Sequence, residues 1–489
     1  MIDSLRLWLA AFSFIVTASC QTAEPDRSNL IRIQDITIVD VGTGVTVPDQ
    51  DVFVRGARIE WVGPAGTSAL PDAGLNIQGE GLFLMPGLWD SHVHIFSAEG
   101  EPDFALELYI LNGVTSIRDM GALISLDDQI KVNTEIESGD RVGPRIINAG
   151  AMIDGPPGSW PGQMVAATPQ EGRARVREAA ALGWTSVKAY SLLDRETYLA
   201  IAEEAETLAL PLYGHVPEGV TLADAIAAGH DVIEHFGRVT KACSTEEREM
   251  IDGARAALAS DDPFQALMFE MATHTMTSFE TWNAALCEET VQKIADAGIA
   301  VAPTLMVSDF YLGKDPPPND PRMQTVPLAV RAQWGETDFR RAAMTPEMLA
   351  IAPAAVRQDW ETFRLAHEAG VMMLASSDAA FLNPFLFHGA TLVDELERYV
   401  AIGLPPQSAL ATATHNPARL FGEGGETGRI EAGQRADMIL LRANPLADIS
   451  AVRDLEIVIA AGRVFDRDWL DNSEAMLRDK AKASGDQVD

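Results

Sequence analysis

Two histidines, His92 and His94, stand one residue apart at the end of the apolar run 82–89. In an extended strand, residues i and i+2 point to the same side of the pleat, so both imidazoles face one way. Neutral imidazole is the commonest metal ligand in proteins, and two on one side make half of a zinc-type site. The pair therefore predicts metal chemistry, provided that further ligands converge on it.

Four further candidate ligands follow, and each closes a short apolar run. They are Lys188 after 185–187, His215 after 212–214, His235 after 232–234 and Asp378 after 371–377. Any one of these residues alone has an ordinary structural explanation, since a lysine can be salt-bridged and a histidine can be hydrogen-bonded in a core. Asp378 is a stronger candidate, because burying a carboxylate without a partner costs free energy and a metal ion is a natural partner for it. Their recurrence, one at each strand end, favours a shared site.

The elements that would position these residues form a repeating series of strands and helices. Helical patterns at 166–182, 195–208, 222–228 and 288–297 separate most of the strands. Strands that alternate with helices predict an α/β fold with a parallel sheet, and eight units predict a closed (β/α)8 TIM barrel with its site at the strand C-termini. The eight predicted strands cover about 83–89, 114–119, 145–149, 185–188, 212–215, 232–235, 299–305 and 371–378.

A smaller β domain is predicted beside the barrel. The stretch 31–62 alternates apolar segments with turns, and two more apolar runs follow at 438–441 and 457–464. Both chain ends are expected to share one β-sandwich. The predicted organisation is a leader at 1–20, the sandwich at 28–82 and 425–468, the barrel at 83–424 and a loosely held polar tail at 469–489.

The chain resembles the amidohydrolase superfamily, in particular its imidazolonepropionase-like and prolidase-like branch. The resemblance spans about residues 30–465 and rests on six ligand positions in the family's order. The matching stretches are Met85–His94, Val187–Tyr190, Gly214–Pro217, Ile233–His235, Ser376–Asp378, Ala413–Leu420 and Gly433–Asp437.

The resemblance implies a centre with two divalent metal ions. His92 and His94 would hold the first ion, His215 and His235 the second, and Asp378 would ligate the first and move protons. Lys188 would be carboxylated by carbon dioxide, giving a carbamate that bridges ions roughly 3.5–4 Å apart. Zinc suits such ligands best, while manganese, cobalt and iron stay open.

Other residues are weaker candidates for contact with substrate. Tyr190 and Arg118 lie near predicted strand ends, and His388 lies on the loop after the last strand. Arg118 could equally pair with a neighbouring aspartate, and a loop histidine is as good an explanation of His388. The Pro- and Gly-rich segment 154–162 is expected to line the mouth of the pocket.

One motif supports a different chemistry. His215 and Glu218 have the His-x-x-Glu spacing that deaminases of this superfamily use, with the glutamate shuttling protons at a single metal. In that interpretation Lys188 is a bystander. Pro217 and Gly219 argue against it, since they place Glu218 in a turn.

The first residues are typical of an export signal. Arg6 precedes the apolar stretch 7–16, and the segment ends at Cys20, which resembles the acylated cysteine of a bacterial lipoprotein. We therefore expect an exported, periplasmic protein that is either lipid-anchored through Cys20 or cleaved by ordinary signal peptidase. The remaining cysteines, Cys243 and Cys287, are expected to form a disulfide in that oxidising compartment.

Composition narrows the functional classes. The net charge of −34 argues against nucleic acid as a partner, because it would repel phosphate. We predict a metal-dependent hydrolase of carbon–nitrogen bonds acting on small substrates, such as N-acyl amino acids or dipeptides, through a metal-bound hydroxide. Cyclic amides, lactones or esters and a non-catalytic binding homologue are the alternatives. The sequence does not decide the substrate or whether the chain forms a homo-oligomer.

Overall fold

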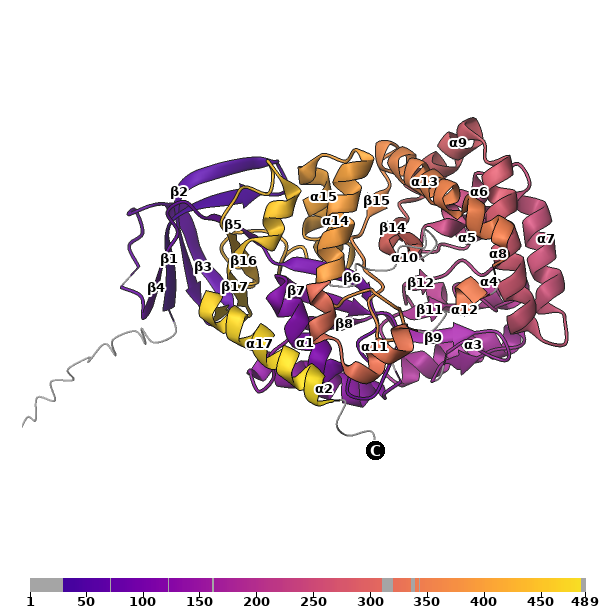
Figure 1. The fold of residues 1–489 in the computed structure, drawn as a ribbon, viewed down its shortest axis with the longest axis horizontal. Coiled ribbons are helices and arrows are strands. Elements are labelled where there is room, and N and C mark those ends of the chain that lie inside the picture. Colours follow the sequence, from indigo (N-terminus) through magenta and orange to yellow (C-terminus); the bar gives the residue numbers. More distant parts are fainter. Residues whose placement is uncertain are drawn as a thin grey trace, which may run out of the picture.

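The computed structural model of the chain describes residues 30–484, apart from 71, 122, 161, 310–319, 336–338 and 343 (Figure 1). The predicted leader and Cys20 lie outside the described residues. Within these ranges no helix has the length and apolar character needed to cross a membrane.

Both chain ends contribute strands to one eight-stranded sheet, drawn in indigo and yellow at the left of Figure 1. Its order is β18-β17-β16-β5-β1-β2-β3, and β4 pairs with β1. A cluster of buried residues that includes Ile33, Leu84 and Met438 packs on this sheet. The strand pairs form one sheet, whereas we predicted a sandwich. The strands are β1 (Leu30–Asp40), β2 (Val45–Arg55), β3 (Arg58–Pro64), β4 (Leu75–Gln78), β5 (Phe83–Pro86), β16 (Met438–Leu441), β17 (Leu455–Ala460) and β18 (Arg463–Phe465).

The remaining strands form two parallel sheets, which follow chain order except that β10 lies at the edge, outside β9. The first is β6-β7-β8 and the second is β10-β9-β11-β12-β13-β14-β15. The two sheets meet where Ser91 N donates to Ala375 O (2.9 Å) and Asp378 N donates to His92 O (2.8 Å). The α/β class and the parallel sheet are confirmed, and the strand order is consistent with a TIM barrel, although the ladders do not form one closed sheet. These strands are β6 (Leu88–Val93), β7 (Val114–Asp119), β8 (Arg145–Asn148), β9 (Ala151–Asp154), β10 (Met164–Val165), β11 (Val187–Ala189), β12 (Leu212–Gly214), β13 (Val232–Glu234), β14 (Ala300–Ala302) and β15 (Met372–Met373).

The prediction of one barrel strand over 83–89 is wrong, because this segment belongs to two strands in different sheets. Residues Phe83–Pro86 pair with β1 and β16 in the mixed sheet, and the parallel strand begins only at Leu88. Gly87 makes the change of sheet, and a Cβ there would meet the side chain of Thr115 at 2.2 Å. The predicted domain boundary at residue 83 therefore precedes a strand of the flanking sheet.

Helices follow most of the parallel strands, and several begin at a side-chain cap. Thr168, Asp194, Thr221 and Asn283 each accept a hydrogen bond from a backbone N–H of the first turn, which satisfies one of the free donors there. The helices are α1 (Pro102–Leu111), α2 (Leu126–Ser138), α3 (Pro169–Ala181), α4 (Arg195–Thr207), α5 (Leu222–Ala227), α6 (Gly237–Ala242), α7 (Glu247–Leu258), α8 (Pro263–Thr281), α9 (Ala284–Ala297), α10 (Leu305–Asp309), α11 (Leu328–Trp334), α12 (Phe339–Ala342), α13 (Pro346–Glu368), α14 (Ala390–Ile402), α15 (Pro406–Thr412), α16 (His415–Leu420) and α17 (Arg467–Ala483).

The C-terminal segment is docked, which corrects the prediction of a loose tail. Helix α17 buries Leu470, Leu477 and Ala481, and it lies along α1 and β17. These buried positions recur at helical spacing, so the helix covers the molecule with one apolar face while its charged residues face outward.

Between β13 and β14 the chain makes a long helical excursion. Helices α7 and α8 form an antiparallel pair, and a disulfide joins Cys243 to Cys287 at its base. The disulfide agrees with the expectation from the sequence. It fixes the two ends of the excursion next to each other.

Candidate metal centre and active-site cavity

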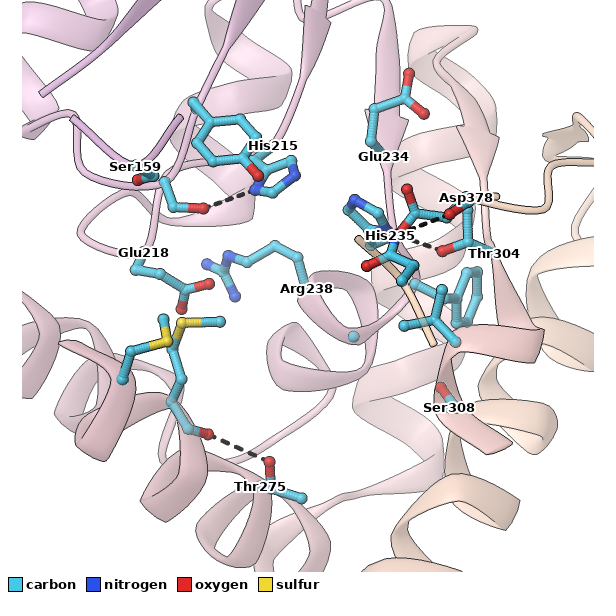
Figure 2. A pocket seen from close by; sticks show the side chains of 18 of the residues that line it. Ser159, His215, Glu218, Glu234, His235, Arg238, Thr275, Thr304, Ser308 and Asp378 are labelled. Atoms are coloured by element: carbon cyan, nitrogen blue, oxygen red, sulfur yellow. Dashed lines mark hydrogen bonds between the residues drawn. The ribbon is translucent and has the colours of Figure 1, made fainter. Parts of the chain in front are cut away.

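The predicted ligands gather at one end of a cavity of about 680 Å³. His94, Lys188, His215, His235 and Asp378 all line it. His94, His215 and His235 each follow directly on a parallel strand, Lys188 lies within β11, and Asp378 lies five residues after β15. The C-terminal ends of parallel strands are where (β/α)8 proteins carry their functional groups. Figure 2 shows His235, Asp378 and Thr304 together on one side of this cavity.

His92, His94 and Asp378 form the first group. The Nε2 atoms of His92 and His94 lie 3.3 and 3.5 Å from Asp378 Oδ1. The Nδ1 atom of His94 lies 3.3 Å from the Gly121 carbonyl oxygen, to which it can donate a hydrogen bond. Both imidazoles therefore present Nε2 to the carboxylate.

His215 and His235 form the second group. Their ring centres are 4.8 Å apart, and the ring of His235 is also 4.8 Å from that of His92. The Nδ1 atoms contact hydroxyls, at 2.6 Å from Ser191 Oγ for His215 and 2.8 Å from Thr304 Oγ1 for His235. Ligand atoms of His92, His235 and Asp378 all lie within 4.8 Å of one another.

This donor set fits divalent metal ions. The Nε2 atoms of His92 and His215 are buried and have no hydrogen-bond partner among the described residues, although the Nδ1 atom of each is engaged. Burial lowers the pKa of His92, His94 and His215 well below the ordinary value, which favours the neutral ring, the form that binds metals. Leaving such nitrogens unpaired would be costly without a ligand.

Lys188 lies in the same cavity and is 1% exposed. Its Nζ donates to the Met120 carbonyl oxygen (2.7 Å) and lies 5.2 Å from the centre of the Tyr190 ring. Burial lowers the pKa of Lys188 to about 8, although the carboxylates of Glu234 and Asp378 oppose the shift. The ammonium is thus easier to deprotonate than that of an ordinary lysine.

Three residues of the site have backbone φ in the left-handed region. The φ values are 64° for His235, 47° for Thr304 and 55° for Asp378. Non-glycine residues seldom adopt this conformation, and it clusters at functional sites where surrounding contacts enforce it. Here it turns each side chain at the end of its strand.

Glu234 is a site residue that sequence reasoning missed. It is fully buried, with Oε2 at 2.8 Å from His92 Nδ1 and Oε1 bound by the Arg118 guanidinium. Arg118, predicted as a substrate contact, lies instead beneath the site, where its Nε donates to Ser91 O (2.7 Å) and its guanidinium covers the Phe421 ring. A glutamate inside the buried strand that ends at His235 was the available signal.

Of the other two predicted substrate contacts, one lines the cavity and the other does not. Tyr190 lines the cavity, stacks on His215 with ring centres 4.1 Å apart, and accepts a hydrogen bond from Trp160 Nε1 (2.8 Å). His388 does not line the cavity, because both of its ring nitrogens are engaged, with Tyr109 Oη at 2.9 Å and Glu101 Oε1 at 3.0 Å.

Trp160 is a further lining residue that the sequence did not single out. Its ring stacks on that of His94, with centres 5.1 Å apart. Trp160 belongs to the segment 154–162 that was predicted to line the mouth of the pocket, although no role was predicted for this residue itself. Ser191 and Thr304, which contact the histidines, carried no recognisable signal.

Glu218 lies across the cavity from His235 and Asp378 in Figure 2. Its carboxylate is 2.8 Å from the Lys241 ammonium. Burial would raise the pKa of Glu218, but the charge and hydrogen bond of Lys241, together with the charges of Arg238 and His274, outweigh burial and hold this pKa below its ordinary value. A carboxylate held ionised by a lysine is a poor proton shuttle.

The sequence of the chain is similar to those of known proteins. A family model described as "Amidohydrolase family" matches residues 83–465. Among curated proteins, an adenine deaminase of Rubrobacter xylanophilus is 39% identical over 79 residues, 16% of this chain and 13% of the relative. An imidazolonepropionase of Micrococcus luteus is 39% identical over 94 residues, 18% of this chain and 23% of the relative. The chain thus matches less than a quarter of the length of these curated relatives.

Similar solved structures share the fold over nearly the whole chain. A bottromycin amidohydrolase has a TM-score of 0.67 at 21% identity, with 93% of this chain and 91% of that chain covered. A Xaa-Pro dipeptidase has a TM-score of 0.62 at 21% identity, with 89% and 100% covered. The ochratoxinase of A. niger has a TM-score of 0.61 at 19% identity, with 90% and 95% covered.

Proposed function

Because the chain belongs to the amidohydrolase family, we propose that it is a metal-dependent hydrolase of carbon–nitrogen bonds in small amides, such as N-acyl amino acids or dipeptides. The observation that carries the proposal is the convergence of His92, His235 and Asp378, whose ligand atoms all lie within 4.8 Å of one another. Beside them, the buried Nε2 atom of His215 makes no hydrogen bond to any described residue. That donor set has no structural use in a core, and it stands at the end of a cavity large enough for a substrate.

His92, His94 and Asp378 would hold one divalent ion, and His215 and His235 the other, with zinc the metal that suits these ligands best. Bound ions would polarise the scissile carbonyl and lower the pKa of water. Lys188 would act as a carbamate. Its neutral amine attacks carbon dioxide, a C–N bond forms, one proton is released, and the nitrogen becomes part of an anionic group with two oxygens.

Asp378 would move the proton. Its carboxylate accepts a proton from the attacking water and transfers it to the nitrogen of the leaving group, so that the amine departs neutral. Glu234 holds His92 in the tautomer that presents Nε2 to the site. Trp160 and Tyr190 form the aromatic wall beside His94 and His215, where the flank of a substrate amide would lie.

A deaminase that uses Glu218 at a single metal is the alternative. The ion pair of Glu218 with Lys241 weighs against it. Lactones and esters would be attacked by the same groups and belong in any substrate screen.

Export to the periplasm is also a proposal. The disulfide between Cys243 and Cys287 supports it, because such bonds persist in oxidising compartments. A lipid anchor at Cys20 remains part of the same proposal.

Elemental analysis of the protein, purified without chelators and in bicarbonate, tests the central claim together with a screen of dipeptides and N-acyl amino acids. We expect close to two ions per chain and measurable hydrolysis. Lys188→Ala should reduce the metal content to one ion or fewer and remove activity, whereas Lys131→Ala, on the exposed surface of α2, should change neither. One ion per chain in both variants, together with deamination activity, would support the single-metal deaminase that uses Glu218.

A further inference from the structure

Helix α8 presents one continuous face to the cavity. Its lining residues follow helical spacing and are apolar except at the last position, where Thr275 Oγ1 donates to Met271 O (3.2 Å). Figure 2 shows Thr275 across the cavity from His235 and Asp378. The lining residues of α8 are Phe264, Leu267, Met268, Met271, Ala272 and Thr275.

Helix α13 packs on α8 and lines the same part of the cavity with smaller side chains. These are Ala352, Ala355 and Val356, followed by Asp359 one turn further on. Alanines opposite methionines leave room, and methionine side chains adapt their shape to what they contact. The two helices therefore border an apolar slot that is continuous with the metal centre.

The slot is held in place from two sides. At the base of the α7–α8 excursion, next to the disulfide, Asn283 N donates to Cys243 O (2.9 Å) and Thr245 N donates to Thr281 O (3.1 Å). Further along, Leu267 is buried in a small cluster with Leu192, which follows the strand that carries Lys188. A wall anchored in this way is formed before a ligand arrives, which lowers the ordering cost of binding.

Lys241, Glu218 and Arg238 line this end of the cavity and each has a protein partner, although the buried Nε of Arg238 makes no hydrogen bond to any described residue. Lys241 pairs with Glu218 at 2.8 Å, and Arg238 pairs with Glu247 at 2.7 Å and donates to Val220 O. A polar ligand would have to replace these bonds, whereas an apolar ligand gains by leaving water. The slot thus favours a hydrocarbon chain or ring.

We propose that this slot, which we call the α8–α13 subsite and define by Met268, Met271, Ala352, Ala355 and Val356, binds an apolar chain or ring on one side of the scissile bond. The inference rests on the proposed function and narrows its substrate class to amides that carry a large hydrophobic group. A cavity of about 680 Å³ is in the range that encloses drug-sized ligands, well beyond the smallest dipeptides.

The test compares two substrate series on the metal-loaded protein. One is N-acylglycines from acetyl to octanoyl, and the other is N-acetyl amino acids with lengthening alkyl side chains. In one series KM should fall about fourfold for each added methylene until the subsite is full. Ala355→Phe should flatten that dependence and leave the KM of the shortest substrate within about twofold.

A double variant, Met268→Ala/Met271→Ala, provides a second test that does not add volume. It should weaken the longest substrate about tenfold or more and leave the shortest unaffected. Met276→Ala, on the same helix but outside the cavity lining, is the matched control and should behave as the unaltered protein. Melting temperatures of all variants identify any that fail to fold.

A binding measurement separates this inference from the proposed function. Octanoate, which cannot be hydrolysed, should quench the fluorescence of the cavity residues Trp160 and Trp334 and lose that effect in Ala355→Phe. Octanoate binding that Ala355→Phe removes, without hydrolysis of any substrate, upholds the subsite and overturns the hydrolase. If substrates are hydrolysed but KM does not depend on chain length in either series and is equal in all variants, the subsite is overturned while the hydrolase stands.

Discussion

Glu234 and His92 form a buried pair, with Glu234 Oε2 at 2.8 Å from His92 Nδ1 and both side chains fully excluded from solvent. The other carboxylate oxygen is bound by Arg118, so the glutamate is held from two sides. A carboxylate on the Nδ1 side fixes the ring so that Nε2 carries the lone pair and faces the site. The pair thereby connects a buried arginine to the candidate metal centre.

Glu234→Gln should weaken metal binding. The amide still fills the space but accepts a weaker hydrogen bond from His92, and loss of such a partner typically costs about 10–100-fold in metal affinity. Zinc titration against a competing chelator measures this. Glu107→Gln, on α1, is the control and should leave affinity unchanged. Equal affinity in Glu234→Gln and the unaltered protein would contradict the role given to Glu234.

Activation of the metal-free protein by bicarbonate and zinc should speed up as pH rises. Only the neutral amine of Lys188 can attack carbon dioxide, and its pKa is lowered by burial to about 8. At pH 7 roughly a tenth of the amine is neutral, against well under a thousandth for an ordinary lysine. The activation rate, measured with total carbon dioxide corrected for pH, should increase about tenfold from pH 6 to 7 and level off above pH 8. A rate that still rises tenfold per pH unit at pH 9 would contradict the lowered pKa.

Asp378→Asn should lower kcat by about 10²–10⁴-fold, because the amide cannot take up the proton of the attacking water. Steady-state kinetics are measured together with metal content, so that loss of an ion is distinguished from loss of proton transfer. Asp296→Asn, on the exposed surface of α9, is the control carboxylate and should retain most activity. More than a tenth of the original kcat in Asp378→Asn with two ions bound would rule out this role.

Replacement of the Glu218–Lys241 pair should separate the two proposed chemistries. Removing both charges in Glu218→Gln/Lys241→Met avoids leaving a buried charge unpaired. With a dinuclear centre and Asp378 as proton carrier, kcat should change by less than about tenfold. Hydrolysis and deamination assays on this variant provide the readout, and a loss of both with metals in place would restore Glu218 to the mechanism.

The disulfide between Cys243 and Cys287 should stabilise the protein. It closes a loop with a sequence separation of 44 residues, for which typical contributions are about 2–4 kcal/mol of unfolding free energy. Thermal unfolding of Cys243→Ser/Cys287→Ser should therefore occur at a lower temperature. Reductant should lower the melting temperature of the unaltered protein and leave the double variant as it is, whereas equal melting in all four samples would show that the bond contributes nothing.

Local pattern was sufficient for most of the candidate site. The alternation of His92 and His94 in an extended strand places both rings on one side, since the pleat has a period of two residues. The apolar runs before Lys188, His215, His235 and Asp378 likewise show where the parallel strands lie, because a parallel strand is buried on both faces, although β15 ends five residues before Asp378. Five of these six side chains line the cavity, and the sixth, that of His92, is not among its lining residues.

Contacts between residues far apart in the chain decided the remaining features of the fold and the candidate site. An apolar segment such as 83–86 can be buried in either sheet, and only its register with β16, more than 350 residues later, assigns it to the mixed sheet. His388 and Arg118 lie near strand ends in sequence, yet packing turns both away from the cavity.

The sequence by itself thus determined the approximate place of the parallel strands, the candidate ligand types and their order, because these depend on hydrophobic periodicity and side-chain chemistry within a few residues. Only the tertiary structure decided that Glu234 joins His92 to Arg118, that α17 docks, and that α8 meets α13 beside the candidate metal centre. Those contacts join residues far apart in the chain, and their free energy depends on burial and distance, which no local pattern encodes.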